Sequence, residues 1–252
     1  MRYSNVLHTA RKHNILKNHK HSLIVSGIMF AVVTIILALL INFSALDTGK
    51  LLGGFLASLS RMIISYSIAL TVAVIIALLI TSNKWLEGLF LPVFDVLQSF
   101  PSFALFPVLV VALKNSPELV IIFVLTITII WPILFTIIGG VKNQREDLEE
   151  AATIFGAKGS KRLWHFTLPQ LLPSIVTGSI VGWGEGWEFI IGAELLVRVN
   201  YGVGAYLGFL GTRQENIALA FGIMVLLLLL YVINKILWIP LLYTVTKFSS
   251  EG

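Results

Sequence analysis

Long apolar runs alternate with short polar intervals along the 252-residue chain. The runs over residues 23–43, 60–81, 118–141, 171–197 and 217–246 each have about the length that an α-helix needs to cross a bilayer. In lipid, backbone N–H and C=O groups must be bonded within the protein, and a helix bonds them within its own segment. The pattern therefore predicts an all-α polytopic membrane protein.

The interval 85–113 departs from this pattern, because Pro92, Pro101 and Pro107 interrupt its apolar residues. We expect an interfacial or scooped helix over 85–98 and a short third span over 103–113 that packs inside protein. A simple kinked helix is the alternative, since proline kinks are common in membrane helices. With this third crossing, the chain has about six transmembrane helices.

Composition supports a membrane environment. Hydrophobic residues make up 57% of the chain and charged residues 12%, and the mean hydropathy is +0.90, which excludes an ordinary soluble domain. The absence of cysteine excludes disulfides, thiolate metal sites and cysteine nucleophiles. The net charge of +5 does not indicate nucleic-acid binding, because the basic residues lie at the ends of apolar runs.

Lysine and arginine are distributed unequally between the two sides of the membrane. The side that holds both termini carries Arg2, Arg11, Lys12, Lys17, Lys20, Lys84, Lys142, Arg145, Lys158, Lys161, Arg162 and Lys247. The opposite side carries Lys50, Arg61, Lys114, Arg198 and Arg213. By the positive-inside rule, we expect both termini and the segment 142–169 in the cytoplasm of a bacterial-type cell membrane.

The domain organisation follows from these spans. Residues 1–22 are predicted to be a basic cytoplasmic tail, 23–246 a single transmembrane domain, and 247–252 a cytoplasmic C-terminal tail. The first apolar run is longer than a signal-peptide core, so we expect it to stay as an uncleaved span. The tail also holds His8, His13, His19 and His21. Because lysines lie between these histidines, a membrane-surface tail is favoured over a metal site, and we expect no bound metal.

The polar interval before the fifth span carries the strongest functional signal. Its apolar residues recur at helical spacing, which predicts two short amphipathic helices broken near residues 156–159. Ser160 is a candidate cap for the second helix. Amphipathicity alone leaves two interpretations open: a helix that docks in a groove of a partner protein, or a helix that lies on the lipid surface.

The spacing of residues in this interval resembles the EAA loop of ABC importer membrane subunits. Glu150-Ala151-Ala152 is followed by Gly156 and then by Phe166-Thr167-Leu168-Pro169, with Phe166 where the family usually has isoleucine. The interval 97–107 is similar to the entry of the third span in the nitrate, sulfonate and taurine group. This resemblance implies the MetI-like, type I ABC importer permease architecture.

The resemblance also implies partners and a role for the loop. In such importers the loop is the coupling element for a cytoplasmic ATPase subunit, which places that role here on Glu149, Glu150, Ala151, Ala152, Phe155, Gly156, Ala157, Leu168 and Pro169. The further partners expected are an extracytoplasmic substrate-binding protein, a second permease copy in a homodimer, and membrane lipid. ATP and Mg²⁺ would bind the ATPase subunit, and this chain, which has no phosphate-binding loop motif, would bind no cofactor and be no enzyme.

Three carboxylates lie inside the fifth span, where an ionisable residue is a functional hypothesis. Glu194 and Arg198 are spaced for an i,i+4 salt bridge near the outer interface. Glu185 and Glu188 have no sequence-local partner. Together with Trp183 and Trp187 they are candidates for the translocation pathway, with hydrogen bonding in a bundle interface as the alternative.

The leading hypothesis is therefore a transmembrane permease subunit of an ATP-driven importer for a small solute, of the nitrate, sulfonate or taurine kind or related to it. Two carboxylates in the pathway would repel an anion, so the resemblance does not fix the substrate. The alternative is a self-sufficient proton-coupled secondary transporter that uses Glu185 or Glu188. Such transporters often contain inverted repeats, and none is evident in this sequence.

Overall fold

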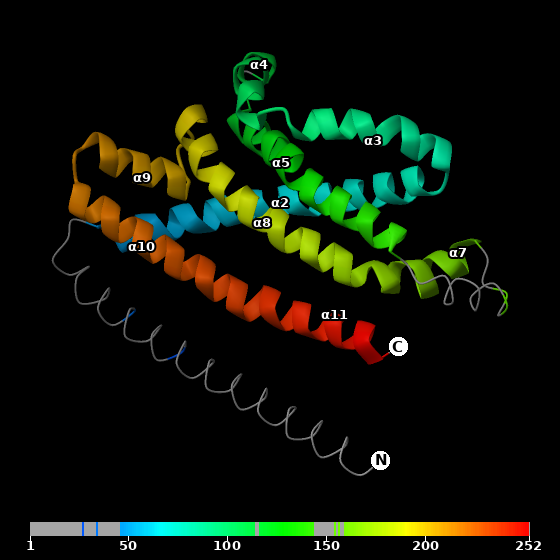
Figure 1. Ribbon diagram of the computed structural model, residues 1–252. Coiled ribbons are helices and arrows are strands. Elements are labelled where there is room, and N and C mark those ends of the chain that lie inside the picture. Colours follow the sequence, from blue (N-terminus) through cyan, green and yellow to red (C-terminus); the bar gives the residue numbers. More distant parts are fainter. Residues whose placement is uncertain are drawn as a thin grey trace, which may run out of the picture.

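The computed structural model describes residues 27, 34, 46–113, 116–143, 154, 156 and 159–251, and the elements within these ranges are helices. The expected N-terminal tail and nearly all of the first expected span lie outside the described residues. Figure 1 shows α2, α5 and α8 grouped together, with α3 and α4 on one side of them and α10 and α11 on the other. The described part of the chain is thus an all-α protein, as the sequence predicts.

Helix α2 spans Thr48–Thr81 and begins well before the predicted residue 60. Its start is fixed by Asp47, whose side chain accepts a hydrogen bond of 3.0 Å from the backbone N–H of Lys50. The backbone N–H of Asp47 in turn donates to the Tyr206 hydroxyl at 2.9 Å. Residues 48–59, which include Gly53 and Gly54, precede the predicted second span. They are helical because the start of the helix is capped and packed.

The core is built from α2, α5 (Pro117–Lys142) and α8 (Leu168–Val197), with α5 packed along both of the others. Buried Ile129 and Ile133 of α5 face the glycine side of α8. A Cβ added at Gly178 would lie 2.9 Å from the Cα of Ile133, so the two backbones approach too closely for any larger residue. Small residues that permit such approach are typical of helix pairs in membranes.

The predicted third span over 103–113 is helical, but only Phe106 in it is buried, so it does not pack inside this chain as expected. Helix α3 (Lys84–Gln98) forms as expected, but the chain then turns through a 3₁₀ segment, η1 (Ser102–Leu105), into α4 (Phe106–Ala112), which is only seven residues long. The two helical parts are bent by 82°, which also rules out a simple kinked helix. Phe103 stacks on Phe189 of α8 with ring centroids 4.0 Å apart, and this contact draws the corner inward.

After α8 come α9 (Val203–Thr212), α10 (Asn216–Ile233), the π-helical η3 (Asn234–Trp238) and α11 (Ile239–Glu251). Helix α9 lies in what reads as a glycine-rich connection over 198–216, and the sequence pattern did not predict it. The predicted sixth span is helical throughout but contains the wider turn η3. Pro240 explains this turn, because proline lacks an N–H and its ring clashes with the carbonyl of the preceding turn.

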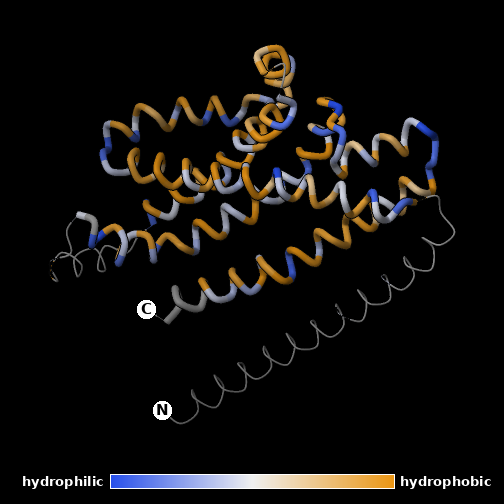
Figure 2. Tube along the Cα trace, turned by 180° about the vertical axis from the view of Figure 1, so that it is seen from behind, coloured by the Kyte–Doolittle hydropathy of each residue, from blue (hydrophilic) through white to orange (hydrophobic). Residues whose placement is uncertain are grey.

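By length and apolar composition, three helices of the described residues could cross a membrane: Thr48–Thr81, Pro117–Lys142 and Asn216–Val245. The bent pair α3 and η1–α4 would make a fourth if it counts as one span. Figure 2 shows hydrophobic positions along most helices and hydrophilic positions at turns, such as those between α2 and α3 and between α9 and α10. Helix α8 is long enough to span but carries three carboxylates.

Candidate functional site

The break predicted in the loop before the fifth span is confirmed by its glycines. Gly156 has φ +72° and Gly159 has φ +55°, backbone conformations that glycine adopts far more readily than other residues. Large apolar side chains are exposed close by, Ile154 at 83% and Trp164 at 64%. Among the predicted coupling residues, Gly156, Leu168 and Pro169 are described, and Glu149, Glu150, Ala151, Ala152, Phe155 and Ala157 lie outside the described residues.

The second predicted amphipathic helix is not a separate element. Helix α7 (Gly159–Arg162) runs through a π-helical turn, η2 (Leu163–Thr167), directly into α8. Because α7 begins at Gly159, the backbone of Ser160 lies inside this helix and not before its start. Leu168 and Pro169 form the first turn of α8. The loop therefore joins the membrane helix as one continuous rod, which Figure 1 shows as α7 and α8 in line.

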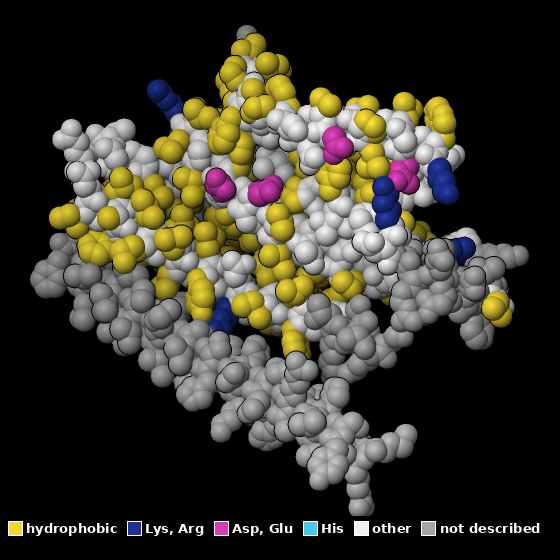
Figure 3. Space-filling model, in the orientation of Figure 1, with side chains coloured by type: hydrophobic (Ala, Val, Ile, Leu, Met, Phe, Trp, Pro, Cys, Tyr) yellow, Lys and Arg dark blue, Asp and Glu magenta, His cyan; other side chains and the backbone are white. Residues whose placement is uncertain are grey.

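The four candidate pathway residues do not share one surface. Glu185 and Glu188 are exposed, and the neighbouring Gly184 faces open space. Figure 3 shows acidic side chains on the surface over α8, among hydrophobic side chains. Trp183 and Trp187 are buried, with only 6% and 3% of their surfaces exposed, so they lie in the core of this chain and not on the surface that the two glutamates occupy.

The two tryptophans instead hold α8 in the core. Trp187 stacks on Phe55 of α2, with ring centroids 5.3 Å apart and planes within 9° of parallel. Trp183 meets Tyr66 edge to face at 5.6 Å, and Tyr66 donates a 2.8 Å hydrogen bond to Ser179 on α8. One side of α8 is therefore fixed to α2 by aromatic contacts, which leaves the glutamates on the opposite, open side.

The predicted salt bridge between Glu194 and Arg198 is wrong. Arg198 ends α8 in the left-handed conformation, with φ 54°, and takes no part in a salt bridge among the described residues. Glu194 is completely buried and accepts hydrogen bonds from Arg61 Nη1 at 2.5 Å, Ser58 Oγ at 2.6 Å and the Gly204 backbone N–H at 2.8 Å. Sequence reasoning assigned the wrong partner because Arg61 lies on another helix.

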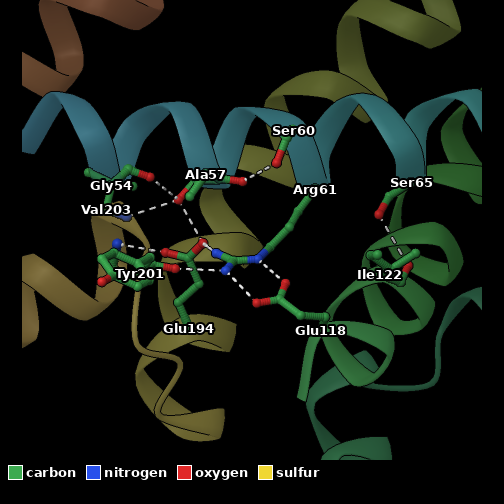
Figure 4. A network of polar contacts seen from close by, with 12 residues as sticks. Gly54, Ala57, Ser60, Arg61, Ser65, Glu118, Ile122, Glu194, Tyr201 and Val203 are labelled. Carbon is green, nitrogen blue, oxygen red and sulfur yellow. Dashed lines mark hydrogen bonds and ion pairs between the residues drawn. The ribbon is translucent and has the colours of Figure 1, made fainter. Parts of the chain in front are cut away.

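Arg61 joins two further elements to this carboxylate (Figure 4). Its Nε and Nη2 donate to the two carboxylate oxygens of Glu118 on α5, at 2.5 and 2.8 Å. Its Nη2 also donates to the backbone carbonyl of Tyr201, in the turn between α8 and α9, at 2.7 Å. We name this set, comprising Arg61, Glu118, Glu194, Ser58 and the Tyr201 carbonyl, the Arg61 cluster.

Small residues allow the Arg61 cluster to close. A Cβ at Gly202 would lie 2.3 Å from Glu194 Oε2, so only glycine leaves room for the buried carboxylate. A Cβ at Gly54 would lie 2.8 Å from the Gly202 carbonyl oxygen, so α2 also touches this turn directly. The Val203 backbone N–H donates to Ser58 Oγ at 2.9 Å. The start of α9 is therefore bonded to α2 through the same hydroxyl that binds Glu194.

The cluster is stabilised by charge pairing. Removing an ion from water costs several kcal/mol, by order of magnitude, unless a counter-charge and hydrogen bonds replace the lost solvation. Arg61 and Glu194 supply these to each other, while the Glu118 side chain, 56% exposed, keeps contact with solvent. The sequence analysis counted Arg61 only among the basic residues on the side of the membrane opposite the termini. It did not predict the pairing of Arg61 with Glu118. A lone arginine at the start of an apolar run was the available signal.

Comparison with known proteins connects this architecture to a family. The family model for the inner membrane component of binding-protein-dependent transport systems matches residues 69–238. The chain belongs to this family. The family description makes the chain a membrane component of a transport system. The match covers Glu118, Glu194, Gly156 and Pro169, but Arg61 and Ser58 lie before it.

The names of several similar proteins mention a solute. The chain is 32% identical over 173 residues to the bicarbonate transport system permease protein CmpB of Synechococcus elongatus, covering 67% of this chain and 62% of that protein. It is 31% identical over 151 residues to the nitrate import permease protein NrtB of Synechocystis sp., covering 60% of this chain and 54% of that protein.

The taurine transport system permease protein TauC of Escherichia coli is 25% identical over 146 residues, covering 57% of this chain and 52% of that protein. The matched part of the chain thus spans between half and two thirds of these three relatives. These names support the expected resemblance to the nitrate, sulfonate and taurine group.

Proposed function

We propose that this permease moves a small solute across the membrane by coupling to a separate cytoplasmic ATPase subunit, which docks on residues 142–169. We name these residues the coupling segment. The observation that carries the proposal is the continuity of α7, η2 and α8, which links the coupling segment to a core helix without a break. Exposed Ile154 and Trp164 offer the apolar contacts that a helix-in-groove partner requires.

In this mechanism the ATPase subunit hydrolyses ATP with Mg²⁺, and the permease supplies the docking element and the pathway. Movement of the docked subunit displaces the coupling segment, and α8 carries this displacement into the membrane domain as a rigid body. An extracytoplasmic binding protein delivers the solute.

The proposed pathway lies along the open side of α8. Glu185 and Glu188 are exposed near the middle of a 30-residue helix, a depth at which a carboxylate needs water or a partner. A second permease copy facing this side would enclose a route between two such helices. The proposed organisation comprises one transmembrane domain over 23–246, with cytoplasmic tails at 1–22 and 247–252.

The proposed solute class rests on two observations: the solutes in the names of the relatives and the negative charge beside the proposed pathway. The three relatives described above are named for bicarbonate, nitrate and taurine, which are anions or carry an anionic group. Two carboxylates beside the route disfavour a simple anion. We therefore propose a small organic solute related to these. Uptake of radiolabelled taurine, measured in competition with unlabelled nitrate and bicarbonate, tests it.

The exposed carboxylates also favour one alternative, a proton-coupled secondary transporter. Vesicles containing the permease with and without its ATPase subunit separate the two functions. Uptake that requires the ATPase subunit and internal ATP supports the importer. Uptake driven by a proton gradient without the ATPase subunit would overturn it.

Orientation is tested independently. A cysteine in place of Lys158 gives a single labelling site, because the chain contains no other cysteine. We expect protection from a membrane-impermeant maleimide in intact cells and labelling after permeabilisation. Labelling in intact cells would place the coupling segment outside and refute ATPase docking.

A further inference from the structure

The coupling segment and the Arg61 cluster lie at opposite ends of one helical run. Helical structure continues from Gly159 to Val197 through α7, η2 and α8. At the rise of an α-helix this run is about 55–60 Å long, enough to reach across a bilayer. Near its far end, Glu194 is buried in the Arg61 cluster. Displacing the near end as a rigid body therefore also moves Glu194.

Arg61 is suited to receive this movement because its guanidinium bonds three elements at once. The Nη1 edge binds Glu194 of α8, the Nε and Nη2 edge binds Glu118 of α5, and Nη2 also binds the Tyr201 carbonyl. A planar guanidinium offers five donors in fixed directions, whereas a lysine ammonium is a point charge with three donors. The geometry of the cluster therefore depends on arginine.

The two carboxylate contacts of Arg61 differ in their access to water. Glu194 has no exposed surface, so water cannot replace Arg61 there without opening the core. The Glu118 side chain is 56% exposed, so water can replace Arg61 at this carboxylate. The bond to Glu194 is therefore the persistent one, and the bond to Glu118 is the one that can exchange as α5 moves.

We propose that Arg61 and Glu194 form a latch that makes the far end of α8, the N-terminal half of α2 and the turn before α9 move together during transport. This inference rests on the proposed function, because the driving movement comes from an ATPase docked on the coupling segment. Arg61 acts as a positioning residue, since its hydrogen bonds to Glu194, Glu118 and the Tyr201 carbonyl hold protein elements in place. The Tyr201 carbonyl extends the latch to the turn.

A cysteine reporter tests the latch in the assembled importer. Tyr201 contributes only its backbone carbonyl to the cluster and is 76% exposed, so Tyr201→Cys adds a reactive thiol and keeps that bond. The permease and its ATPase subunit are reconstituted together in proteoliposomes. The labelling rate with a charged maleimide is measured without nucleotide and after trapping with ATP and vanadate. With the latch intact, we expect trapping to change the rate by about fivefold or more.

The decisive variant adds Arg61→Met and Glu194→Met to the reporter. Replacing a buried ion pair by apolar residues of similar volume often preserves stability. Ser58 keeps its bond to the Gly54 carbonyl, only the Gly204 N–H loses its acceptor, and Glu118 is left in contact with water. We expect the labelling response to fall below about twofold, while the ATPase subunit still co-purifies. Arg61→Lys, which keeps the charge and loses the planar fork, is a second variant and should lose the response in the same way.

Arg198→Met is the matched control, because Arg198 is a cation in the same turn that lies outside the cluster. It should respond like the parent. An undiminished response in both the Arg61→Met/Glu194→Met and Arg61→Lys proteins would overturn the latch while leaving ATPase docking intact. A parent reporter that does not respond to trapping would overturn the proposed coupling itself, and the latch with it.

Discussion

Arg61 and Glu194 are 133 positions apart in the chain and form an ion pair of 2.5 Å. The Arg61 side chain is 6% exposed and the Glu194 side chain has no exposed surface, so the pair is shielded from water on both sides. In the part of the chain that the structure describes, no other ion pair has both side chains buried. The first prediction follows from this burial.

Glu194→Ala should destabilise the protein strongly. The change leaves Arg61 with an unpaired edge in the core and removes the acceptor for Ser58 and Gly204. Breaking one partner of a buried pair typically costs roughly 3–5 kcal/mol. Thermal unfolding in detergent measures the loss, and Glu188→Ala, on the exposed side of the same helix, is the control. Equal melting temperatures for the two variants would contradict the assigned role of Glu194.

The glycines of α8 should separate into sensitive and tolerant positions. Gly178→Ala places a Cβ 2.9 Å from the Cα of Ile133, which forces α5 and α8 apart, at a cost of about 1–3 kcal/mol. Gly184→Ala meets no atom within 4 Å and should be neutral or slightly stabilising. Unfolding measurements on the two variants check this, and a Gly178→Ala protein as stable as Gly184→Ala would refute the close helix contact.

Substitutions in the coupling segment should weaken its docking to the ATPase. Gly156→Ala must adopt φ near +72°, which costs an alanine about 1–2 kcal/mol. Glu150→Gln removes a charge from the element that resembles an EAA loop. We expect less co-purified ATPase subunit, or ATP hydrolysis that no longer supports uptake. Gly88→Ala, on exposed α3 with no atom within 4 Å of the added Cβ, serves as the control. Normal co-purification together with normal uptake in both loop variants would argue against docking here.

The exposed carboxylates should affect transport and leave stability unchanged. Glu185→Gln and Glu188→Gln remove charge from the open side of α8 without disturbing the core. If these groups line the route, uptake should change by several-fold in KM or in maximal rate. Asp95→Asn, which removes a carboxylate from exposed α3, is the matched control. Wild-type uptake kinetics in both glutamate variants would return these residues to a structural role.

Asp47 should give a pH dependence at the start of α2. The Lys50 backbone N–H holds the pKa of the Asp47 carboxyl below its usual range, because that hydrogen bond favours the charged form. A lowered pKa in the folded protein adds stability above the unfolded pKa, and this stability is lost as the pH falls through the folded pKa. Asp47→Asn should therefore lower the melting temperature at neutral pH and not in acid. A difference independent of pH would contradict this.

Helix positions could largely be predicted from the sequence, whereas helix partners could not. The apolar runs that predict spans correspond to α2, α5, α8 and the run from α10 to α11, because bilayer-length apolar segments have few alternatives to a helix. The 82° bend between α3 and η1–α4 was not predicted, because the sequence marks prolines but not the Phe103–Phe189 contact at the corner. Helix α9 was missed because its glycines fit close contacts with α8 that only the fold reveals.

Some features of the functional residues could likewise be predicted from the sequence, and others could not. The break at Gly156 and Gly159 was predictable, since a backbone with positive φ selects glycine locally. The burial of Trp183 and the exposure of Glu185 were not, because both lie in one apolar run and only neighbouring helices decide which side faces the core. The sequence by itself determined that this is a helical membrane protein with a polar segment before the fifth apolar run, because hydrophobicity and turn chemistry act over short stretches of chain. The tertiary structure alone decided that Glu194 pairs with Arg61, because a buried charge takes the partner that packing brings within reach, whatever its distance along the chain.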